Sequence, residues 1–253
     1  MISVILIGTG NVAHHFIKAF YKSNKVNLVQ VYGRNQEALE SIPFSVPTTN
    51  NLKLLADADV FLMAISDDAI KELTRNFPFK NKLLVHTSGT QPLESVQNTN
   101  RKGVFYPLQT FSKNKSVNFS DIPICIEANN TADERLLMHL AKSISNTVHI
   151  VDSAKRKYLH LAAVFANNFT NYCYALANEI CNENQLDFKM LLPLIQETAQ
   201  KVTNLSPLAA QTGPARRNDK KTIAAHLNLL DSDKKEIYKQ LTKAIQYTYG
   251  KKL

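Results

Sequence analysis

The 253-residue sequence has no hydrophobic run long enough to cross a membrane. A spanning helix needs roughly 18 or more consecutive apolar residues, and no segment reaches that length. The apolar N-terminus lacks the basic segment of a signal peptide and ends in a glycine turn, so we interpret it as a buried strand. Since no other targeting signal is present, we expect a cytoplasmic protein without a membrane partner.

Disulfide and metal chemistry also lack their usual patterns. The three cysteines, Cys125, Cys173 and Cys181, show no CxxC spacing. In a cytoplasmic chain we interpret them as small core residues. No group of His, Cys, Asp and Glu has the spacing of metal ligands, so we expect no metal site.

The sequence has fewer acidic than basic residues: 21 Asp and Glu compared with 30 Lys and Arg, which gives a formal net charge of +9. Such an excess of positive charge is one feature of nucleic-acid-binding proteins. The basic residues are spread along the chain, however, and no basic motif is interleaved with aromatic residues. We therefore expect no nucleic-acid partner and interpret the charge as solvated surface that attracts anionic ligands.

The first 152 residues alternate short apolar strands with helical segments. Strand patterns occur at residues 3–7, 26–32, 59–65, 83–86, 104–106, 122–126 and 148–151. A repeated strand, helix, strand order is typical of a doubly wound, mostly parallel sheet. We predict an α/β fold with a Rossmann-type domain over residues 1–152.

The pattern changes after residue 152, where apolar residues recur every three or four positions. Residues 155–184 predict a single long helix, and further helices are predicted at 187–204, 220–230 and 232–249. Residues 205–219 form a loop-rich joint that contains helix breakers. We predict an all-α domain over residues 153–253.

The motif Gly8-x-Gly10-x-x-Ala13 follows the first strand and opens the first helix, where a dinucleotide-binding fingerprint belongs. Gly8 permits the tight turn, Gly10 lets the backbone approach a pyrophosphate, and Ala13 lets the helix pack closely on the strand. The start of the helix, with Thr9, Asn11 and Val12, adds unpaired N–H groups and partial positive charge. We predict that these residues bind a dinucleotide; the alternative is a purely structural glycine turn.

The end of the second strand distinguishes NAD from NADP. An NAD site needs a carboxylate there to accept a hydrogen bond from the ribose 2′-hydroxyl. This sequence has Gly33-Arg34-Asn35 instead, and its first acid, Glu37, lies inside the next helix. A guanidinium binds a 2′-phosphate through two hydrogen bonds. We predict NADP as the cofactor; the alternative is a solvated surface arginine.

Small residues lie at the C-terminal ends of two further strands. Ala64 and Ser66 are at the end of one strand, and Ser88 is at the end of the next. Ligands of open α/β sheets lie at these strand ends, so we predict that the three residues border the cofactor. Ordinary strand-to-helix turns explain them equally well.

The segments Gly8–Ala13 and Gly33–Asn35, with the all-α C-terminal half, resemble the 6-phosphogluconate dehydrogenase and pyrroline-5-carboxylate reductase superfamily. More narrowly, the chain is similar to an uncharacterised bacterial family described as NADP oxidoreductases. Four segments carry this narrower resemblance: HTSG from His86, YPLQTF from Tyr106, HLAAV from His160 and TGPARR from Thr212. The resemblance implies a helical dimerisation domain, a cleft between the domains, and hydride transfer between nicotinamide and a C=O or C=N bond.

The long helix departs from the superfamily pattern at the expected catalytic position. Many relatives carry a Lys and an Asn four residues apart, whereas this sequence has His160 followed by Asn167 and Asn168. On an α-helix this spacing keeps the three side chains on one face. His160 is our candidate proton donor, with a structural histidine as the alternative. Asn167 or Asn168 is the candidate that orients a substrate oxygen.

Further candidates lie in the loop between helices and on the Rossmann side. Thr212 and Arg216 are expected to close the cleft and hold an anionic group of the substrate, while His86 and Gln109 are alternative site residues.

We therefore predict an NADP-dependent oxidoreductase of an unidentified small substrate, dimeric through its C-terminal helices. The missing Lys–Asn pair leaves a second hypothesis, a non-catalytic NADP(H)-binding sensor or interaction protein.

Overall fold

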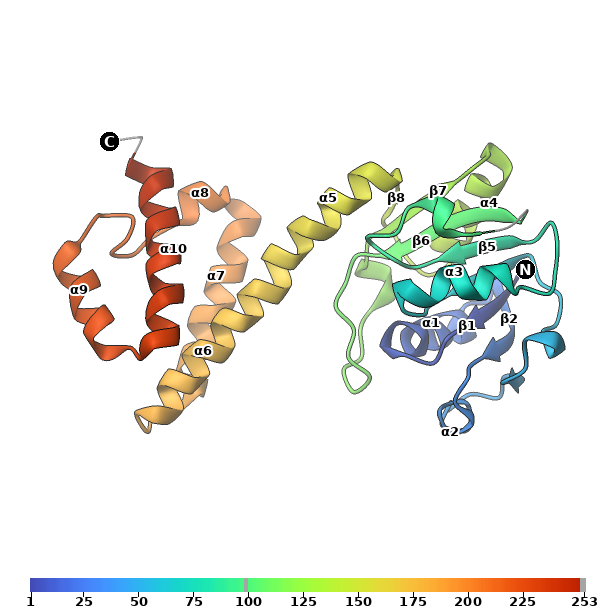
Figure 1. Cartoon of the computed structure of the whole chain (residues 1–253), viewed down its shortest axis with the longest axis horizontal. Helices are drawn as coiled ribbons and strands as arrows, with labels where there is room; N and C mark the ends of the chain where they lie inside the picture. Colours follow the sequence, from blue (N-terminus) through green and yellow to red (C-terminus); the bar gives the residue numbers. More distant parts are fainter. Residues whose placement is uncertain (98–99, 251–253) are drawn as a thin grey trace. The chain divides into compact units, whose positions relative to one another are not determined.

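The computed structural model describes residues 1–97 and 100–250. The chain divides into two compact units, Met1–Asn168 and Phe169–Leu253 (Figure 1). This division lies within a continuous helical segment, so the first helix of that segment belongs to the N-terminal unit. The boundary predicted near residue 152 lies at the start of the same helix.

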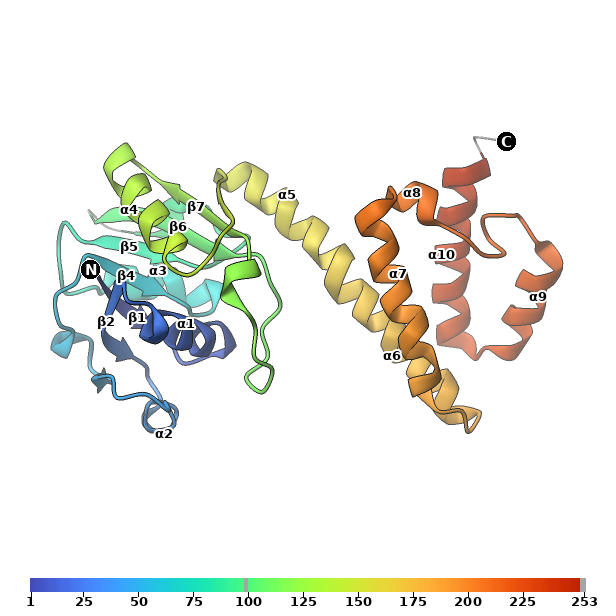
Figure 2. The ribbon, with the colours of Figure 1, turned by 180° about the vertical axis from the view of Figure 1, so that it is seen from behind.

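An eight-stranded sheet forms the centre of the N-terminal unit (Figures 1 and 2). The strands run in the order β3-β2-β1-β4-β5-β6-β7-β8, and within the described residues β6 and β7 are the only neighbours that pair antiparallel. Their bounds are β1 (Ile2–Ile7), β2 (Val26–Tyr32), β3 (Thr48–Thr49), β4 (Val60–Met63), β5 (Leu83–His86), β6 (Arg101–Pro107), β7 (Ile124–Ala128) and β8 (Val148–Ile150). The predicted doubly wound, mostly parallel sheet is confirmed, and the two-residue β3 is an addition to it.

Helices cover both faces of this sheet, as the alternation along β1 shows. Val4 and Leu6 belong to a core cluster with residues of α1 (Asn11–Lys22) and α4 (Thr131–Lys142). Ile5 and Ile7 belong to a second cluster that includes a residue of α3 (Asp67–Arg75). Successive side chains of a strand point to opposite faces, so a strand that is buried on both sides is apolar throughout. Apart from α5, described below, the other described helices of this unit are short: α2 (Gln36–Glu40) and the 3-10 turns η1 (Leu52–Leu54), η2 (Leu93–Ser95) and η3 (Phe119–Asp121).

Residues 153–250 form helices joined by turns, and no strand occurs in this described range. The predicted long helix consists of α5 (Ser153–Ala163), a π-helical segment (Val164–Phe169) and α6 (Thr170–Glu183). A 3-10 turn, η5 (Phe188–Leu191), leads into α7 (Leu192–Asn204), which is followed by α8 (Pro207–Ala210), α9 (Lys220–Leu229) and α10 (Ser232–Gly250). In the described part of the chain, none of the helices combines the length and apolar character that crossing a bilayer requires.

The cysteines do not all lie where the sequence indicated. Cys125 on β7 and Cys181 on α6 are buried, but Cys173 on α6 is exposed. The interpretation of Cys173 as a core residue is therefore wrong. The reason is that the face of α6 that carries it is not covered, although its apolar spacing is that of a buried face.

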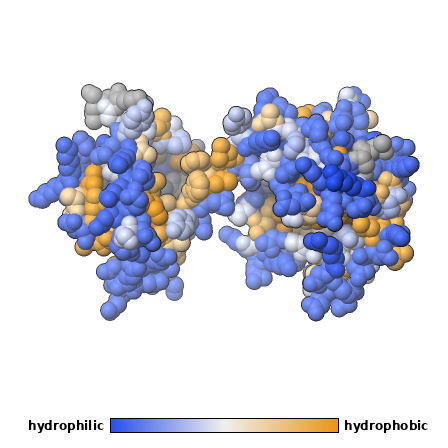
Figure 3. Space-filling view, viewed as in Figure 1, coloured by the Kyte–Doolittle hydropathy of each residue, from blue (hydrophilic) through white to orange (hydrophobic). Residues whose placement is uncertain are grey.

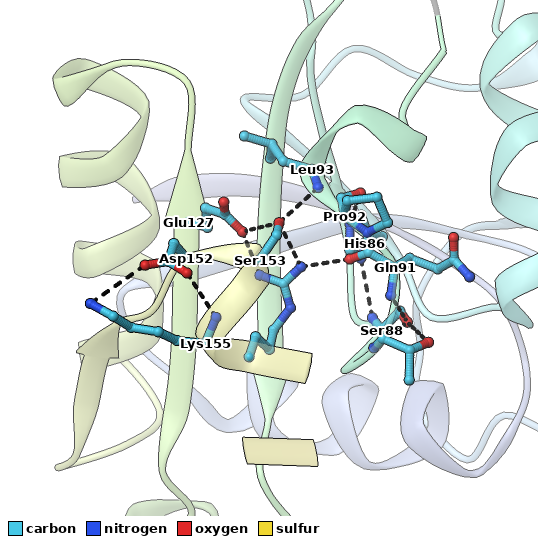
Figure 4. Close-up of polar contacts among 11 residues, drawn as sticks. His86, Ser88, Gln91, Pro92, Leu93, Glu127, Asp152, Ser153 and Lys155 are labelled. Carbon is cyan, nitrogen blue, oxygen red and sulfur yellow. Dashed lines mark hydrogen bonds and ion pairs between the residues drawn. The ribbon is translucent and has the colours of Figure 1, made fainter. Parts of the chain in front are cut away.

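A buried arginine attaches the first turn of α5 to the sheet. Arg156 is 1% exposed and forms an ion pair with Glu127 of β7. Its Nη2 donates to the Gln91 carbonyl oxygen (2.6 Å) and to Ser153 Oγ (3.1 Å). Ser153 Oγ in turn donates to Glu127 (2.7 Å) and accepts from the backbone N–H of Leu93 (3.0 Å), as Figure 4 shows. Buried charge pairs of this kind fix geometry more than they add stability. The network therefore orients α5 relative to β7 and to the loop after β5.

Candidate functional site

A cavity of about 550 Å³ opens at the carboxyl ends of β1, β2 and β4. Its lining includes Gly8–Val12 (the glycine loop), Gly33–Asn35, Ala64–Ser66, Thr87 and, on α3, Glu72. β1 lies between β2 and β4, where the order of the strands reverses, and ligands of open α/β sheets bind at this switch point. The volume is within the range of small-molecule and cofactor sites.

The two glycines of the glycine loop have different roles. Gly8 has φ +126°, and a Cβ there would lie 2.2 Å from the carbonyl oxygen of Ala64. Gly8 is therefore required by the fold itself. Gly10 has an ordinary φ of −75°, and a Cβ there would meet nothing within 4 Å. Because Gly10 also lines the cavity, a side chain at this position would occupy space that a ligand can use.

The N-terminus of α1 faces this space with its backbone donors. No side chain caps the helix, and its first turn contains no acidic residue. The first N–H groups of a helix have no partner within the helix, and together with the helix dipole they bind phosphate. The side chain of Asn11 donates to the carbonyl oxygen of Phe111 (3.2 Å). The group of Asn11 that is available to a ligand is therefore its backbone N–H. Ala13 is fully buried, as close packing of α1 on the sheet requires.

The turn after β2 presents an unpaired guanidinium. Arg34 is exposed, lines the cavity, and has no hydrogen bond or ion pair with another described residue. Asn35 caps α2 by accepting from the N–H of Ala38 (3.0 Å). A Cβ on Gly33 would lie 2.5 Å from Cγ2 of Thr9, so the glycine lets the turn pack against the glycine loop. Arg34 is thus the charged group of this turn that remains available to a phosphate.

The turns after β4 and β5 differ in which of their residues line the cavity. Ala64 and Ser66 line it, and the Ser66 hydroxyl has no partner among the described residues. Ser88 does not line the cavity; its Oγ accepts from the N–H groups of Thr90 (3.1 Å) and Gln91 (3.0 Å) within its own turn. Thr87, which the sequence analysis did not select, lies at the cavity instead. Its position follows from strand register, since its N–H donates to the carbonyl oxygen of Met63 (3.2 Å).

His86, an alternative candidate, lies inside the core with no exposed surface. The N–H of Ser88 donates to its Nδ1 (3.2 Å), so the ring hydrogen is on Nε2, which donates to the carbonyl oxygen of Pro92 (3.3 Å). Burial, reinforced by the positive charge of Arg156, lowers the pKa of His86 to about 4. His86 is a neutral histidine that holds its turn together. Gln109, the other alternative, is exposed and accepts from the N–H of Thr110 (2.8 Å).

His160 lies in a cluster with Tyr106 and Gly89, all within the N-terminal unit. Its Nδ1 is 3.1 Å from the Tyr106 hydroxyl. A Cβ on Gly89 would lie 2.5 Å from the same nitrogen. Thr87 lines the cavity two positions before Gly89, so one short turn extends from the cavity to His160. Gly89 and Tyr106 belong to the segments HTSG and YPLQTF, but the spacing of these segments along the chain does not predict their contact with His160.

The π-helical segment changes the position of two other candidates. Asn167 and Asn168 lie in this segment, both exposed, with 3.5 Å between Nδ2 of the first and Oδ1 of the second. A π-helix has more residues per turn than an α-helix. The assumption that α-helical spacing relates these asparagines to His160 is therefore wrong.

The last two candidates, Thr212 and Arg216, belong to the C-terminal unit. Nη1 of Arg216 donates to the carbonyl oxygens of Gln211 and Ala209 (3.4 Å to the latter). Its Cζ lies 5.2 Å from the ring centroid of Tyr249. Nε and Nη2 of Arg216 have no partner among the described residues, so they are available to an anion.

Comparison with known proteins adds to this geometry. Residues 3–89 match a family described as "NADP oxidoreductase coenzyme F420-dependent", and residues 122–245 match a domain of unknown function, DUF2520. A solved structure from Bacteroides fragilis, described as a "putative NADP oxidoreductase", is 40% identical, with 97% of this chain and 98% of that chain covered and a TM-score of 0.90. No curated protein sequence matches the chain.

Two more distant structures share the fold. A pyrroline-5-carboxylate reductase from Streptococcus pyogenes is 13% identical (98% of each chain covered, TM-score 0.66). A reductive aminase from Aspergillus terreus, solved with NADPH and ethyl levulinate, is also 13% identical (98% of this chain and 93% of that chain, TM-score 0.71). The prediction of NADP as the cofactor is confirmed by the family match over residues 3–89 and by the similarity to the Bacteroides fragilis protein.

Alanine substitutions should separate the two glycines of the glycine loop. Gly8→Ala should lower the free energy of unfolding by about 2 kcal/mol or more, because of its positive φ and the contact with Ala64. Gly10→Ala should leave the melting temperature unchanged and weaken NADPH binding about tenfold or more, equivalent to ~1.4 kcal/mol. Thermal melts and NADPH titrations of both variants check this. A Gly10→Ala protein with unchanged affinity would contradict the placement of the cofactor.

Proposed function

We propose that this chain, which belongs to the NADP oxidoreductase family represented by the Bacteroides fragilis protein, transfers a hydride between the nicotinamide of NADP and a C=O or C=N bond of a small substrate. The bound cofactor supplies the hydride chemistry. One observation carries the proposal: the turn Thr87–Gly89 begins in the cavity lining and ends against His160. The family whose description mentions coenzyme F420 matches only residues 3–89, so F420 is not part of the proposal.

The residues around the cavity would hold the cofactor by its phosphates. The N–H groups at the start of α1 would bind the pyrophosphate, and the open space at Gly10 admits it. Arg34 would bind the 2′-phosphate, because its guanidinium is unpaired and lies at the cavity. The Ser66 hydroxyl, also unpaired, would add a further hydrogen bond.

His160 would present a proton to the substrate oxygen or nitrogen that gains charge as the hydride arrives. Imidazole is the side chain best suited to this role near neutral pH. Asn167 or Asn168 would orient the same substrate atom. Thr212 and Arg216 would hold an anionic group of the substrate, since two nitrogens of the Arg216 guanidinium are without a partner in the described part of the chain.

We also propose that the chain is a homodimer joined through its C-terminal helices. Among the described residues 169–250, only Cys181, Ala215 and Thr242 are buried. Large apolar side chains are exposed instead, including Met190 (73%) and Leu194 (62%), and Figure 3 shows apolar surface over this unit. A unit of this size gains little stability from so small a core, because burial of apolar surface is the main stabilising contribution. The same unit of a second copy would complete the core, as in obligate dimers whose interface resembles a domain core cut in half.

Arg34→Ala should weaken NADPH binding by about 10- to 100-fold, because a charge-assisted hydrogen bond contributes about 1.5–3 kcal/mol. NADH binding should stay nearly the same, since NADH has no 2′-phosphate. Fluorescence titrations with both cofactors check this, with Arg135→Ala as the control: Arg135 is an exposed arginine on α4. Equal losses for the two cofactors would refute the assignment of Arg34 to the 2′-phosphate.

His160→Ala should abolish most turnover, with kcat lowered by about 10²- to 10⁴-fold, while the affinity for NADPH is kept. NADPH oxidation is first screened in the wild type with ketoacids, imines and semialdehydes, and the variant is then tested with the best substrate. His226→Ala, on α9, is the control. Unchanged turnover in His160→Ala would remove His160 from the mechanism. A wild-type protein that binds NADPH but turns over none of these compounds would favour the non-catalytic sensor.

Leu194→Arg should convert the dimer to a monomer or prevent folding of the C-terminal unit, because it places a charge in the proposed interface. Leu54→Arg is the matched control: Leu54 is 65% exposed but lies in the N-terminal unit. Light scattering should give twice the mass of one chain for the wild type and for Leu54→Arg. A monomeric wild type would refute the dimer.

A further inference from the structure

We propose that Tyr106 is a positioning residue that fixes the tautomer of His160: its hydroxyl donates to Nδ1, so the ring hydrogen is on Nε2 and is aimed at the ligand. This inference rests on the proposed function, because it assigns the atom of His160 that meets the substrate. The inference depends on the burial of Tyr106, on the bond to His160, and on the position of Gly89.

Tyr106 is a buried side chain at the end of β6. It is 9% exposed and belongs to an apolar cluster with Leu93, Val104 and Cys125. Its hydroxyl lies 3.1 Å from Nδ1 of His160, and the two rings meet at 65° with centroids 6.0 Å apart. Among the described residues the hydroxyl has no other hydrogen-bond partner. A buried phenol whose hydrogen has no acceptor is destabilising, because the hydroxyl has lost its hydrogen bond to water without a replacement.

The direction of this hydrogen bond follows from the chemistry of the two groups. Burial raises the pKa of Tyr106, with a smaller contribution from Cys125, so the phenol keeps its hydrogen near neutral pH. In neutral imidazole one nitrogen accepts and the other carries the hydrogen. Because Tyr106 donates to Nδ1, the hydrogen of His160 is on Nε2. No described residue is bonded to Nε2, and His160 is only half-buried, so this N–H is available to a ligand.

Gly89 makes room for the bonded pair. A Cβ at this position would lie 2.5 Å from Nδ1 of His160 and 3.0 Å from Cζ of Tyr106. The turn that borders the cavity therefore packs directly on the Tyr106–His160 hydrogen bond. With Nδ1 held by Tyr106, His160 meets a carbonyl oxygen or imine nitrogen through Nε2–H in a fixed direction, and a donor that is already in place stabilises charge that develops on that atom.

The test is ¹⁵N NMR of protein with ring-labelled histidine, because the two nitrogens of a neutral imidazole differ in shift according to which carries the hydrogen. The signals of His160 are assigned by their loss in His160→Ala. The wild type at pH 8 should show the hydrogen on Nε2. Tyr106→Phe, which keeps the ring and its packing, should lose this preference and show both tautomers. Gly89→Ala should do the same by displacing the imidazole.

The chain contains a matched control. His226 Nδ1 lies 2.9 Å from the hydroxyl of Tyr238 in the C-terminal unit, with ring centroids 5.8 Å apart. Tyr238→Phe should therefore alter the His226 signals and leave those of His160 unchanged. A wild-type His160 with its hydrogen on Nδ1, or a His160 tautomer that is unchanged in Tyr106→Phe, would overturn the inference.

The NMR measurement needs neither substrate nor turnover, so it separates this inference from the proposed function. A protein with the expected tautomer but no turnover keeps the inference and loses the function. Where turnover is found, Tyr106→Phe should lower kcat about tenfold or more with little change in KM. The variant loses the fixed direction of the Nε2–H but keeps the residues that bind the substrate. An unchanged kcat would count against Tyr106 as a positioning residue.

Discussion

The candidate site depends on the close contact between the ends of β1, β2 and β4. The N–H of Gly8 donates to the carbonyl oxygen of Tyr32 (2.8 Å), and the N–H of Ala64 donates to that of Ile7 (2.8 Å), so three strands end at one level. The space between them has no room for a side chain at Gly8. This contact sends the chain sharply into α1 and directs the first N–H groups of the helix into the cavity. The turn after β2, with Arg34, comes to the same edge by the same register.

A second constraint connects the sheet to the helix that carries His160. The ion pair of Arg156 with Glu127 and the bond from Arg156 to the Gln91 carbonyl attach α5 both to β7 and to the loop after β5. Asp67, the first residue of α3, accepts from the hydroxyl of Thr90 in that loop (2.5 Å). The loop is therefore bonded on one side to α5 and on the other to the helix that follows the cavity-lining turn of β4. His160 lies one turn beyond Arg156 on α5, so these polar contacts help to set its position relative to the cavity.

The two units differ in how they obtain a core. The N-terminal unit buries both faces of its sheet with its own helices. The C-terminal unit has helices with the spacing of buried faces but almost no buried residues in its described part. Its apolar residues therefore predict helices correctly without forming a large core among themselves. In the dimer proposed above, the folding of this unit and the association of the two chains would contribute to a single free-energy balance.

The sequence by itself determined the features that depend on residues close together in the chain. Hydrophobic periodicity predicted the strands and helices, Gly8-x-Gly10-x-x-Ala13 predicted the turn into α1, and the residues after β2 pointed to NADP, because each of these signals is local. Only the tertiary structure decided which polar groups are free. It enclosed His86, bonded Ser88 within its own turn, exposed Cys173, and placed a π-helical segment at Asn167 and Asn168. It also joined Tyr106 to His160 and Arg156 to Gln91, pairs that lie 54 and 65 positions apart. The physical reason is that availability to a ligand depends on burial and on long-range hydrogen bonds, which no spacing along one chain segment encodes.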